Sequence, residues 1–329
     1  MDILVLHPGA LGDIILSLPA LAILRRTFPQ AGITLAGNHD YLTAISPGYA
    51  ERLLSLSGLP LHNLFGREPV PPADRQFWTS FDRILSWTGF GDAEFCRNLN
   101  SSARSVLVVP WRPEAGEARH VSRIFVDSIR PWVGEQREIP APTISLSPCE
   151  LTKGETWLTE NGWNRSRPIV ALHPGAGSVS KRWPLENFRE LAIRIMQSGA
   201  QLMAVEGPAE HGVSREMALG LPGAPVVAAR ILPLETLAAA LSLCAAFVGN
   251  DSGIAHMAGA LGVPSVVLFG PTSPEQWAPI GGRVGILRTP AGCRACGKKD
   301  GSEHTCMRNL SVDCAWNCFQ SFYPARYLP

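Results

Sequence analysis

The segment ILVLHPGALGD, residues 3–13, returns in outline as IVALHPGAGSV at residues 169–179. Each copy is a short apolar run that ends in the same five letters, LHPGA. A continuous apolar run closed by a turn is typical of a buried parallel strand. Two interpretations are open: two doubly wound domains that each use the loop after the first strand, or a turn sequence that suits any strand end.

Outward from these segments, short apolar runs alternate with stretches of helical periodicity. Strands are predicted at residues 1–6, 32–36, 84–87, 105–109, 169–172, 201–205, 246–248 and 265–269, and helices at 14–28, 185–197, 234–243 and 253–261. Such alternation predicts right-handed β-α-β units and parallel sheets, and therefore an α/β fold. The periodicity fades between residues 134 and 148, where three prolines occur, so we expect a linker there. The predicted domains are residues 1–148 and 149–329, each Rossmann-like and doubly wound.

The composition excludes several classes of protein. The 329 residues are 46% hydrophobic and 17% charged with a net charge of +1, which is unlike a disordered chain or a polybasic nucleic-acid binder. The most apolar stretch, residues 253–269, is interrupted by His256, Gly259, Gly262 and Pro264, so no membrane span is expected. Because Asp2 and Asp13 do not fit a signal peptide, we expect a cytoplasmic protein with reduced cysteines.

The first candidate site follows the first predicted strand. Gly9 and Gly12 allow a tight turn, and Asp13 comes at the start of the next helix. A carboxylate at the carboxyl end of a parallel strand lies where α/β sheets bind their ligands. The alternative is a structural N-cap, which aspartate also favours. The dinucleotide spacing GxGxxG is absent, which argues against an oxidoreductase.

The second candidate site is the loop HPGAGSVSKRWP at residues 173–184. Its glycines permit close backbone approach, Ser178 and Ser180 offer hydroxyls, and Lys181 and Arg182 supply positive charge ahead of a helix N-terminus. Together these groups predict a diphosphate cradle, although the Walker A spacing is absent. The alternative is a solvated basic loop.

The third candidate site is GNDSGIAH at residues 249–256, again between a strand and a helix. We expect the backbone N–H groups of Ser252 and Gly253 to favour phosphate, and Asp251 to bind sugar hydroxyls. The alternatives are an N-cap role for Asp251 and a packing role for His256. Thr272 adds a hydroxyl after the following strand, and residues 206–210 are either a ribose contact or a surface turn.

In family order, these motifs resemble glycosyltransferase family 9, the ADP-heptose:lipopolysaccharide heptosyltransferases. The resemblance is carried by Gly12-Asp13 with LPAL at residues 18–21, SKRWP at 180–184, DSGIAH at 251–256 and GPT at 270–272. It implies the B-type glycosyltransferase fold, two Rossmann-like domains facing a cleft, with the nucleotide-sugar on the C-terminal domain. It also implies that Asp13 is the catalytic base and that Lys181 contacts the diphosphate.

Further expectations follow from the resemblance. Ser178, Ser180, Lys181, Asp251, Ser252, Gly253, His256 and Thr272 would bind the nucleotide-sugar, and His7 and Gly12 would contact the acceptor or a phosphate. Family members often carry arginine where this chain has His7. The N-terminal domain would bind the acceptor, although residues 38–130 carry no motif of the family.

The reaction implied is inverting transfer of heptose from ADP-heptose to the lipopolysaccharide inner core, with no cofactor required. The partners would be the nucleotide-sugar and a lipid-linked saccharide at the inner membrane surface, without nucleic acid, and the enzyme would be cytoplasmic or peripheral to that membrane. The alternatives are transfer from another nucleotide-sugar or to another acceptor, a sugar-nucleotide epimerase or hydrolase, and a non-catalytic nucleotide-sugar binding protein.

Five of the eight cysteines lie near the C-terminus, at Cys293, Cys296, Cys306, Cys314 and Cys318. A CxxC pair with more distant cysteines can form a structural zinc site. The second pair is spaced as CxxxC, and the chemistry inferred above needs no metal. A structural metal site and unmetallated thiols therefore both remain as interpretations.

Overall fold

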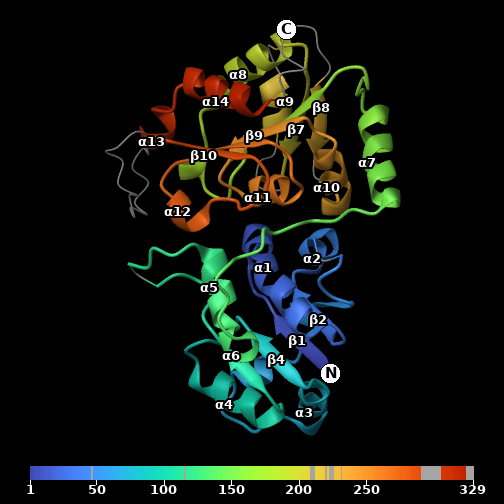
Figure 1. Ribbon diagram of the computed structural model, residues 1–329, viewed down its shortest axis with the longest axis vertical. Helices are drawn as coiled ribbons and strands as arrows, with labels where there is room; N and C mark the ends of the chain where they lie inside the picture. Colours follow the sequence, from blue (N-terminus) through green and yellow to red (C-terminus); the bar gives the residue numbers. More distant parts are fainter. Residues whose placement is uncertain are drawn as a thin grey trace. The chain divides into compact units, whose positions relative to one another are not determined.

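The computed structural model describes residues 1–45, 47–114, 116–207, 212–218, 221, 226–230, 232–289 and 305–323. The chain divides into two compact units, Met1–Ser145 and Leu146–Pro329, each built on one parallel sheet (Figure 1). This confirms the predicted α/β class with two doubly wound sheets. Between the end of one unit's last helix at Val133 and the start of the next helix at Pro148 there is no helix or strand.

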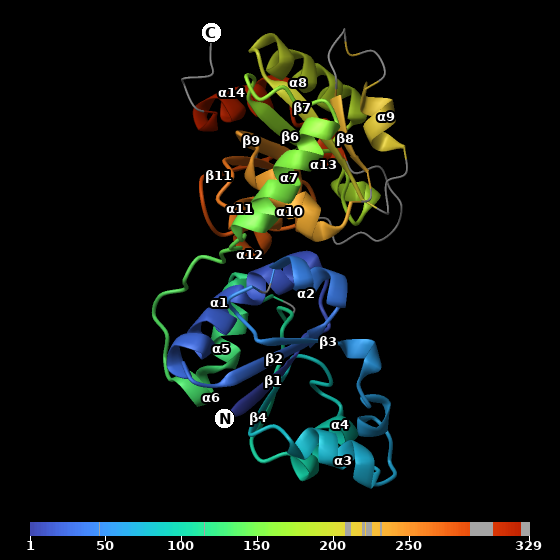
Figure 2. The same ribbon diagram turned by 90° about the vertical axis from the view of Figure 1, so that its right-hand side faces the viewer.

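The sheet of the first unit has the strand order β3-β2-β1-β4-β5. Its strands are β1 (Asp2–Leu6), β2 (Gly32–Gly37), β3 (Arg52–Ser55), β4 (Arg83–Ser86) and β5 (Val106–Val108). Its helices are α1 (Leu11–Thr27), α2 (His39–Ile45), α3 (Pro72–Thr79), α4 (Ala93–Ser102), α5 (Val121–Ser128) and α6 (Arg130–Val133), with 3-10 turns η1 (Leu56–Gly58) and η2 (His62–Leu64). Helices α3 and α4 cover one face of the sheet, and α1 and α5 cover the other (Figure 2).

The sheet of the second unit has the strand order β11-β10-β9-β6-β7-β8. Its strands are β6 (Ile169–His173), β7 (Gln201–Glu206), β8 (Val226–Arg230), β9 (Ala246–Asn250), β10 (Ser265–Phe269) and β11 (Val284–Arg288). Its helices are α7 (Pro148–Glu160), η3 (Val179–Lys181), α8 (Leu185–Gln197), α9 (Val213–Ala218), α10 (Leu234–Ser242), α11 (Gly253–Ala260), α12 (Pro274–Trp277), α13 (Thr305–Arg308) and α14 (Val312–Phe322).

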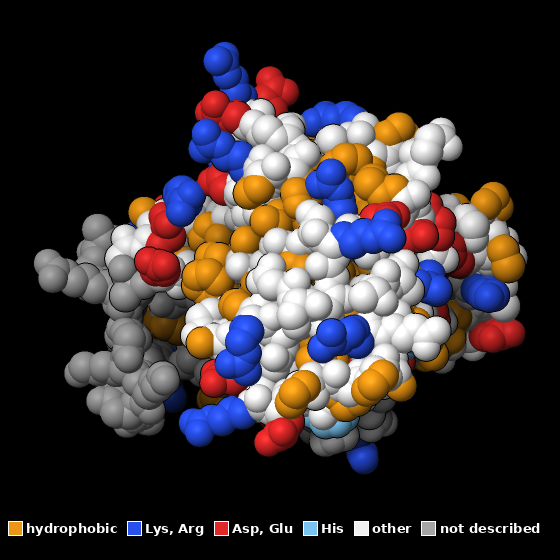
Figure 3. All heavy atoms as spheres, turned by 90° about the horizontal axis from the view of Figure 1, so that it is seen from below, with side chains coloured by type: hydrophobic (Ala, Val, Ile, Leu, Met, Phe, Trp, Pro, Cys, Tyr) orange, Lys and Arg blue, Asp and Glu red, His pale blue; other side chains and the backbone are white. Residues whose placement is uncertain are grey.

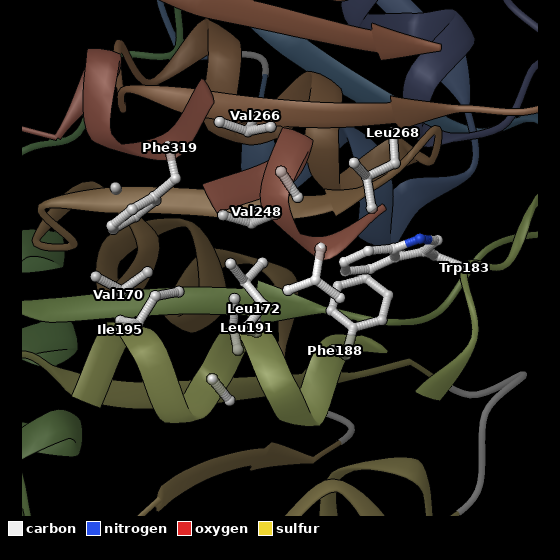
Figure 4. Close-up of a cluster of buried hydrophobic side chains, with 14 of the residues drawn as sticks. Val170, Leu172, Trp183, Phe188, Leu191, Ile195, Val248, Val266, Leu268 and Phe319 are labelled. Atoms are coloured by element: carbon white, nitrogen blue, oxygen red, sulfur yellow. The ribbon is translucent and has the colours of Figure 1, made fainter. Parts of the chain in front are cut away.

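The main core of the second unit lies between its sheet and the pair α8 and α14 (Figure 4). Alternate residues of the central strands, such as Val170 and Leu172 of β6, point to this face, where Phe188 and Phe319 pack on them. The strand sequences read as continuous apolar runs because α10 and α11 bury the opposite face. The sheet is therefore held rigidly at its centre, where β6 and β9 are neighbours.

Each sheet has one point at which the winding of the chain reverses. In the first sheet it lies between β1 and β4, and in the second between β6 and β9. In open α/β sheets, ligands bind outside the carboxyl ends of the strands at such a point. The two LHPGA segments contain the last residues of β1 and β6 and the start of the loops that follow, so both copies of the repeat lie at these positions.

The eight predicted strands are present, and three further strands, β3, β8 and β11, were not predicted. All three lie at the outer ends of the two sheets. β3 and β11 are only partly buried and lack the continuous apolar run that burial on both faces demands. β8 (VVAAR) does carry an apolar run, which the prediction overlooked. Helix α1 begins at Leu11 and not at residue 14 as predicted. The prediction was wrong because no capping side chain stands at Ala10 to signal the start.

Among the described residues, no helix combines the length and apolarity needed to cross a bilayer. On the face shown in Figure 3, basic and acidic side chains are interspersed with apolar and uncharged ones. This mixture agrees with the net charge of +1 for the chain.

Candidate active site

Three side chains predicted to bind the nucleotide-sugar meet at the carboxyl edge of the second sheet. The ammonium Nζ of Lys181 lies 2.7 Å from Oδ2 of Asp251, and the hydroxyl of Thr272 donates to the same oxygen at 2.6 Å. Each comes from a different loop, after β6, β9 and β10, which are neighbouring strands. Residues up to 91 positions apart in the sequence are thus brought to the switch point between β6 and β9.

The geometry of this cluster leaves several groups available to a ligand. Asp251 is only 5% exposed, and both of its side-chain hydrogen bonds end on Oδ2, so Oδ1 has no partner in the described part of the chain. Lys181 is 29% exposed and uses one of its three N–H groups on Asp251. A buried carboxylate oxygen suits a sugar hydroxyl, and a partly exposed ammonium suits a phosphate oxygen.

Helix α11 begins directly beside Asp251. Its N-cap is Ser252, whose hydroxyl accepts from the backbone N–H of Ala255 at 3.3 Å. The N-cap interpretation of Asp251 is therefore wrong, because the next residue performs that role. Gly253 is the first helical residue, and the N–H groups of the first turn have no partners within the helix, as an anion site requires. His256 is buried on the same helix, at 5% exposure, as its packing interpretation expects.

The remaining groups of the second loop have local partners. The hydroxyls of Ser178 and Ser180 lie 2.8 Å apart on the exposed side of the loop that carries Lys181. Arg182 donates to the carbonyl of Ala176 at 3.1 Å, which closes the loop on itself. Lys181 is therefore the cation of this loop that faces the carboxylate of Asp251.

The predicted ribose contact is described only at its start. Glu206 is buried at the end of β7, and its carboxylate accepts from the backbone N–H of Gly212 at 2.9 Å. Residues 208–211 lie outside the described residues. A ribose contact there stays a prediction.

In the first unit, Asp13 lies inside the first turn of α1. Its Oδ2 accepts the backbone N–H of Ala10 at 2.9 Å, and the residue is half-buried. The interpretation of Asp13 as the N-cap residue is wrong, because the N-cap is Ala10 and Asp13 is the third residue of the helix. Its carboxylate still stabilises the start of the helix. Gly12 lies beside it in the first turn of α1, where backbone N–H groups have no partners within the helix.

His7 shapes the turn that leads into this helix. Its Nδ1 accepts the backbone N–H of Gly9 at 3.0 Å, which leaves the proton of the neutral ring on Nε2. The ring is fully buried beside Trp87 and Phe125, with ring centroids 5.1 and 5.4 Å away. This burial lowers the pKa of His7 to about 3, so the ring is neutral at ordinary pH. Its buried Nε2 has no hydrogen-bond partner among the described residues.

A cavity of about 750 Å³ opens beside this turn within the first unit. It lies at the carboxyl ends of β1, β2 and β3, and its polar lining includes His7, Asn38, Asp40, Ser55 and His62. Cavities of this size hold small organic ligands, and lining groups that both donate and accept hydrogen bonds suit a polyhydroxylated one.

Comparison with known proteins identifies the family of the chain. Residues 118–306 match the model of glycosyltransferase family 9 (heptosyltransferase). The chain belongs to this family. It is 25% identical to lipopolysaccharide heptosyltransferase 2 of Escherichia coli (strain K12), over 92% of both chains. As a member of family 9, the protein is a glycosyltransferase.

Solved structures of family 9 proteins share the fold. The family 9 glycosyl transferase from Veillonella parvula superimposes with a TM-score of 0.79 at 18% identity, over 98% of this chain and 97% of that one. The ADP-heptose LPS heptosyltransferase II of E. coli gives a TM-score of 0.76 at 19% identity, over 98% of both chains. The architecture is therefore that of the family over nearly the full length.

The predicted metal site in this family 9 chain is only partly described. Cys293 and Cys296 lie outside the described residues, whereas Cys306 is buried, Cys314 exposed and Cys318 half-buried. Within the described ranges, no group of three or more metal-binding side chains is assembled. The choice between a structural metal and unmetallated thiols stays a prediction.

Sequence reasoning missed one residue at the site, Asn250. It is the last residue of β9, fully buried, and its amide bonds to both ends of the loop that carries Lys181. The signal was present, because a polar amide in the last position of a buried strand requires hydrogen-bond partners. The identity of those partners depends on a loop whose ends lie 67 and 76 positions earlier in the chain, which the sequence pattern does not reveal.

Proposed function

We propose that this family 9 glycosyltransferase transfers heptose from ADP-heptose to a saccharide of the lipopolysaccharide inner core, with inversion at the anomeric carbon. The observation that carries the proposal is the meeting of Lys181, Asp251 and Thr272 at the switch point of the second sheet. The relatives' names support the substrates, since they are lipopolysaccharide heptosyltransferases.

In this proposal, the second unit binds the donor. Lys181 contacts the diphosphate, together with the first-turn N–H groups of α11, which begin at Gly253. Oδ1 of Asp251 accepts a hydroxyl of the sugar, while Thr272 and Lys181 fix the orientation of the carboxylate through Oδ2. The hydroxyls of Ser178 and Ser180 lie on the same loop and add donors for phosphate oxygens.

The first unit binds the acceptor and supplies the base. The acceptor saccharide occupies the cavity beside the His7 turn, whose polar lining includes Asn38, Ser55 and His62. Gly12 contacts the acceptor through its backbone N–H in the first turn of α1, where N–H groups have no partner within the helix. Asp13 removes the proton from the attacking hydroxyl. Because the His7 ring is buried and neutral, His7 contributes to the acceptor site by holding the turn through the hydrogen bond from Gly9, and it adds no positive charge there.

The reaction proceeds as one displacement. The acceptor oxygen attacks the anomeric carbon from the face opposite the diphosphate, through a transition state with oxocarbenium character. Negative charge grows on the leaving ADP, and Lys181 and the α11 N-terminus stabilise it. The protein's own groups supply both functions, so we infer that no cofactor is required. The lipid-linked acceptor places the reaction at the cytoplasmic face of the inner membrane.

A donor panel tests this proposal. The enzyme is incubated with a truncated inner-core acceptor and, in turn, the ADP, UDP, GDP and CMP sugars, and products are identified by mass spectrometry and NMR. We expect acceptor-dependent addition of one heptose from ADP-heptose only, with an inverted anomeric linkage. Transfer from UDP or GDP sugars would overturn the donor assignment. Formation of free heptose without acceptor would show that the enzyme is a hydrolase. Formation of an isomerised nucleotide-sugar without acceptor would show that it is an epimerase.

A further inference from the structure

The side chain of Asn250 connects three segments of the second unit. Its Nδ2 donates to the carbonyl of Pro174 at 2.7 Å and, over 3.4 Å, to that of Gly175. Its Oδ1 accepts the backbone N–H of Trp183 at 3.1 Å. The residue is 0% exposed, so these hydrogen bonds are shielded from competition with water.

These contacts lie on either side of the loop that carries Lys181. Pro174 and Gly175 precede the loop and Trp183 follows it, so one amide holds both of its ends against the end of β9. The Trp183 end is also anchored in the core, because its indole donates to the carbonyl of Leu310 at 2.9 Å and its ring packs on Phe188 (Figure 4). Inside the loop, Arg182 bonds to Ala176 and keeps the segment compact.

The residue after Asn250 is Asp251, the partner of Lys181. Asn250 therefore joins the loop of Lys181 to the strand end that presents Asp251, and the 2.7 Å contact between the two charged groups depends on that junction. We propose that Asn250 is a positioning residue for the donor diphosphate: it fixes the Lys181 ammonium relative to Asp251 without touching the substrate. This inference rests on the proposed function for the identity of the ligand.

The strand end leaves little freedom for another arrangement. Asn250 pairs in register with Leu268 of β10, and the next backbone N–H, of Asp251, donates to the carbonyl of Leu268 at 3.0 Å. The backbone of residues 250 and 251 is thus fixed by the sheet, and the Asn250 side chain transmits that position to both ends of the loop. A displacement of about 1 Å between a binding group and its ligand is enough to reduce rates 100-fold.

The test compares Asn250→Ala with Gln201→Ala. Gln201 is a matched control, because it is a buried amide of β7 whose side chain donates to Gly162 at 2.6 Å and accepts from the N–H of Asn164 at 2.9 Å. Gln201 is the first residue of β7, whereas Asn250 is the last residue of β9. Because the sheet is parallel, the contacts of Gln201 lie at the amino ends of the strands, away from the Lys181 loop at their carboxyl ends. Both variants lose a buried amide, and both are expected to have a lower melting temperature.

Two readouts separate positioning from general stability. Hydrogen exchange of the backbone at residues 176–183 should become faster in Asn250→Ala and stay as in the wild type in Gln201→Ala. The affinity for ADP-heptose, measured by isothermal titration calorimetry, should fall about 10- to 100-fold in Asn250→Ala and stay unchanged in Gln201→Ala. Unchanged exchange in this loop, or equal loss of affinity in both variants, would overturn the inference. If the wild type fails to bind ADP-heptose, the donor assignment falls, and the exchange comparison still decides whether Asn250 fixes the loop.

Asn250→Asp adds a conservative test. A carboxylate at this position still accepts from Trp183 but cannot donate to Pro174, whereas the protonated acid can donate. Burial and the neighbouring charge of Asp251 are expected to raise the pKa of the new carboxyl group. Affinity for ADP-heptose should therefore recover as the pH is lowered from 8 to 6, while the wild type shows no such gain. No recovery relative to the wild type would contradict a role for the Pro174 hydrogen bond.

Discussion

The ammonium of Lys181 lies 2.7 Å from a carboxylate oxygen of Asp251, a residue 70 positions further along the chain. The pair is asymmetric, since the Asp251 side chain is 5% exposed and the Lys181 side chain 29%. A buried carboxylate held by a partly exposed lysine is a site in which the lysine is already oriented for an incoming anion. The same contact therefore joins the loops after β6 and β9 and, in the proposed function, orients the lysine for the diphosphate.

Lys181→Met tests both roles of this contact. Methionine keeps much of the apolar stem and removes the charge, so the buried Asp251 carboxylate keeps, among the described residues, the Thr272 hydroxyl as its one side-chain partner. We expect a loss of roughly 1–3 kcal/mol in the free energy of unfolding, measured by urea denaturation. ADP-heptose affinity should fall in the same variant. Adding Asp251→Asn should restore part of the stability but none of the affinity, and a double variant no more stable than Lys181→Met would contradict the pairing.

Gly9→Ala tests the close approach of the His7 turn to the proposed base. A Cβ at position 9 would lie 2.6 Å from Cβ of Asp13 and 2.7 Å from Cε1 of His7, so these side chains must move. We expect kcat to fall about 10- to 100-fold with unchanged affinity for ADP-heptose. Gly58→Ala is the control in the same unit, because its Cβ would meet no atom within 4 Å. Equal kcat in both variants would show that the turn does not set the position of Asp13.

His7 predicts a pH dependence of stability. Burial lowers its pKa to about 3 in the folded protein, whereas the unfolded chain titrates near 6.5. Below pH 6.5 the unfolded state gains a proton that the folded state does not take. The free energy of unfolding therefore decreases as the pH is lowered from about 6.5 to about 3. At pH 5 the loss from this residue is about 2 kcal/mol.

Urea denaturation of the wild type and His7→Asn between pH 7.5 and 5 measures this dependence. Asparagine places a side-chain oxygen close to the position of Nδ1, where it can accept from Gly9, and it does not titrate in this range. We compare slopes, because the smaller side chain lowers stability at every pH. The variant should have the flatter profile, and parallel profiles would show that His7 is not buried in its neutral form.

The sequence predicts the parts of this architecture that depend on local chemistry. Apolar runs closed by His-Pro-Gly turns predict the central strands, because burial on both faces demands such runs. Glycines, hydroxyls and Lys181 within one loop predict an anion site for the same local reason. The edge strand β3 cannot be predicted in this way, because it is only partly buried and has no continuous apolar run.

The missing parts depend on contacts between distant residues. No local pattern states that Lys181 pairs with Asp251, or that Asn250 holds the loop after β6, because both contacts arise from the strand order of the folded sheet. The early start of α1 has a different cause. Ala10 cannot cap a helix with its side chain, and Asp13 supports the first turn from three residues later.

The central claim is that Asp13 activates the acceptor while the second unit holds the donor. The most direct measurement is single-turnover transfer from ADP-heptose by Asp13→Asn, with donor affinity measured in parallel. Asparagine can still accept the N–H of Ala10, so the helix start is preserved. The rate of transfer should fall about 10²–10⁴-fold with donor affinity unchanged. Transfer at nearly the wild-type rate, with the donor bound as tightly, would contradict the assignment of Asp13 as the base.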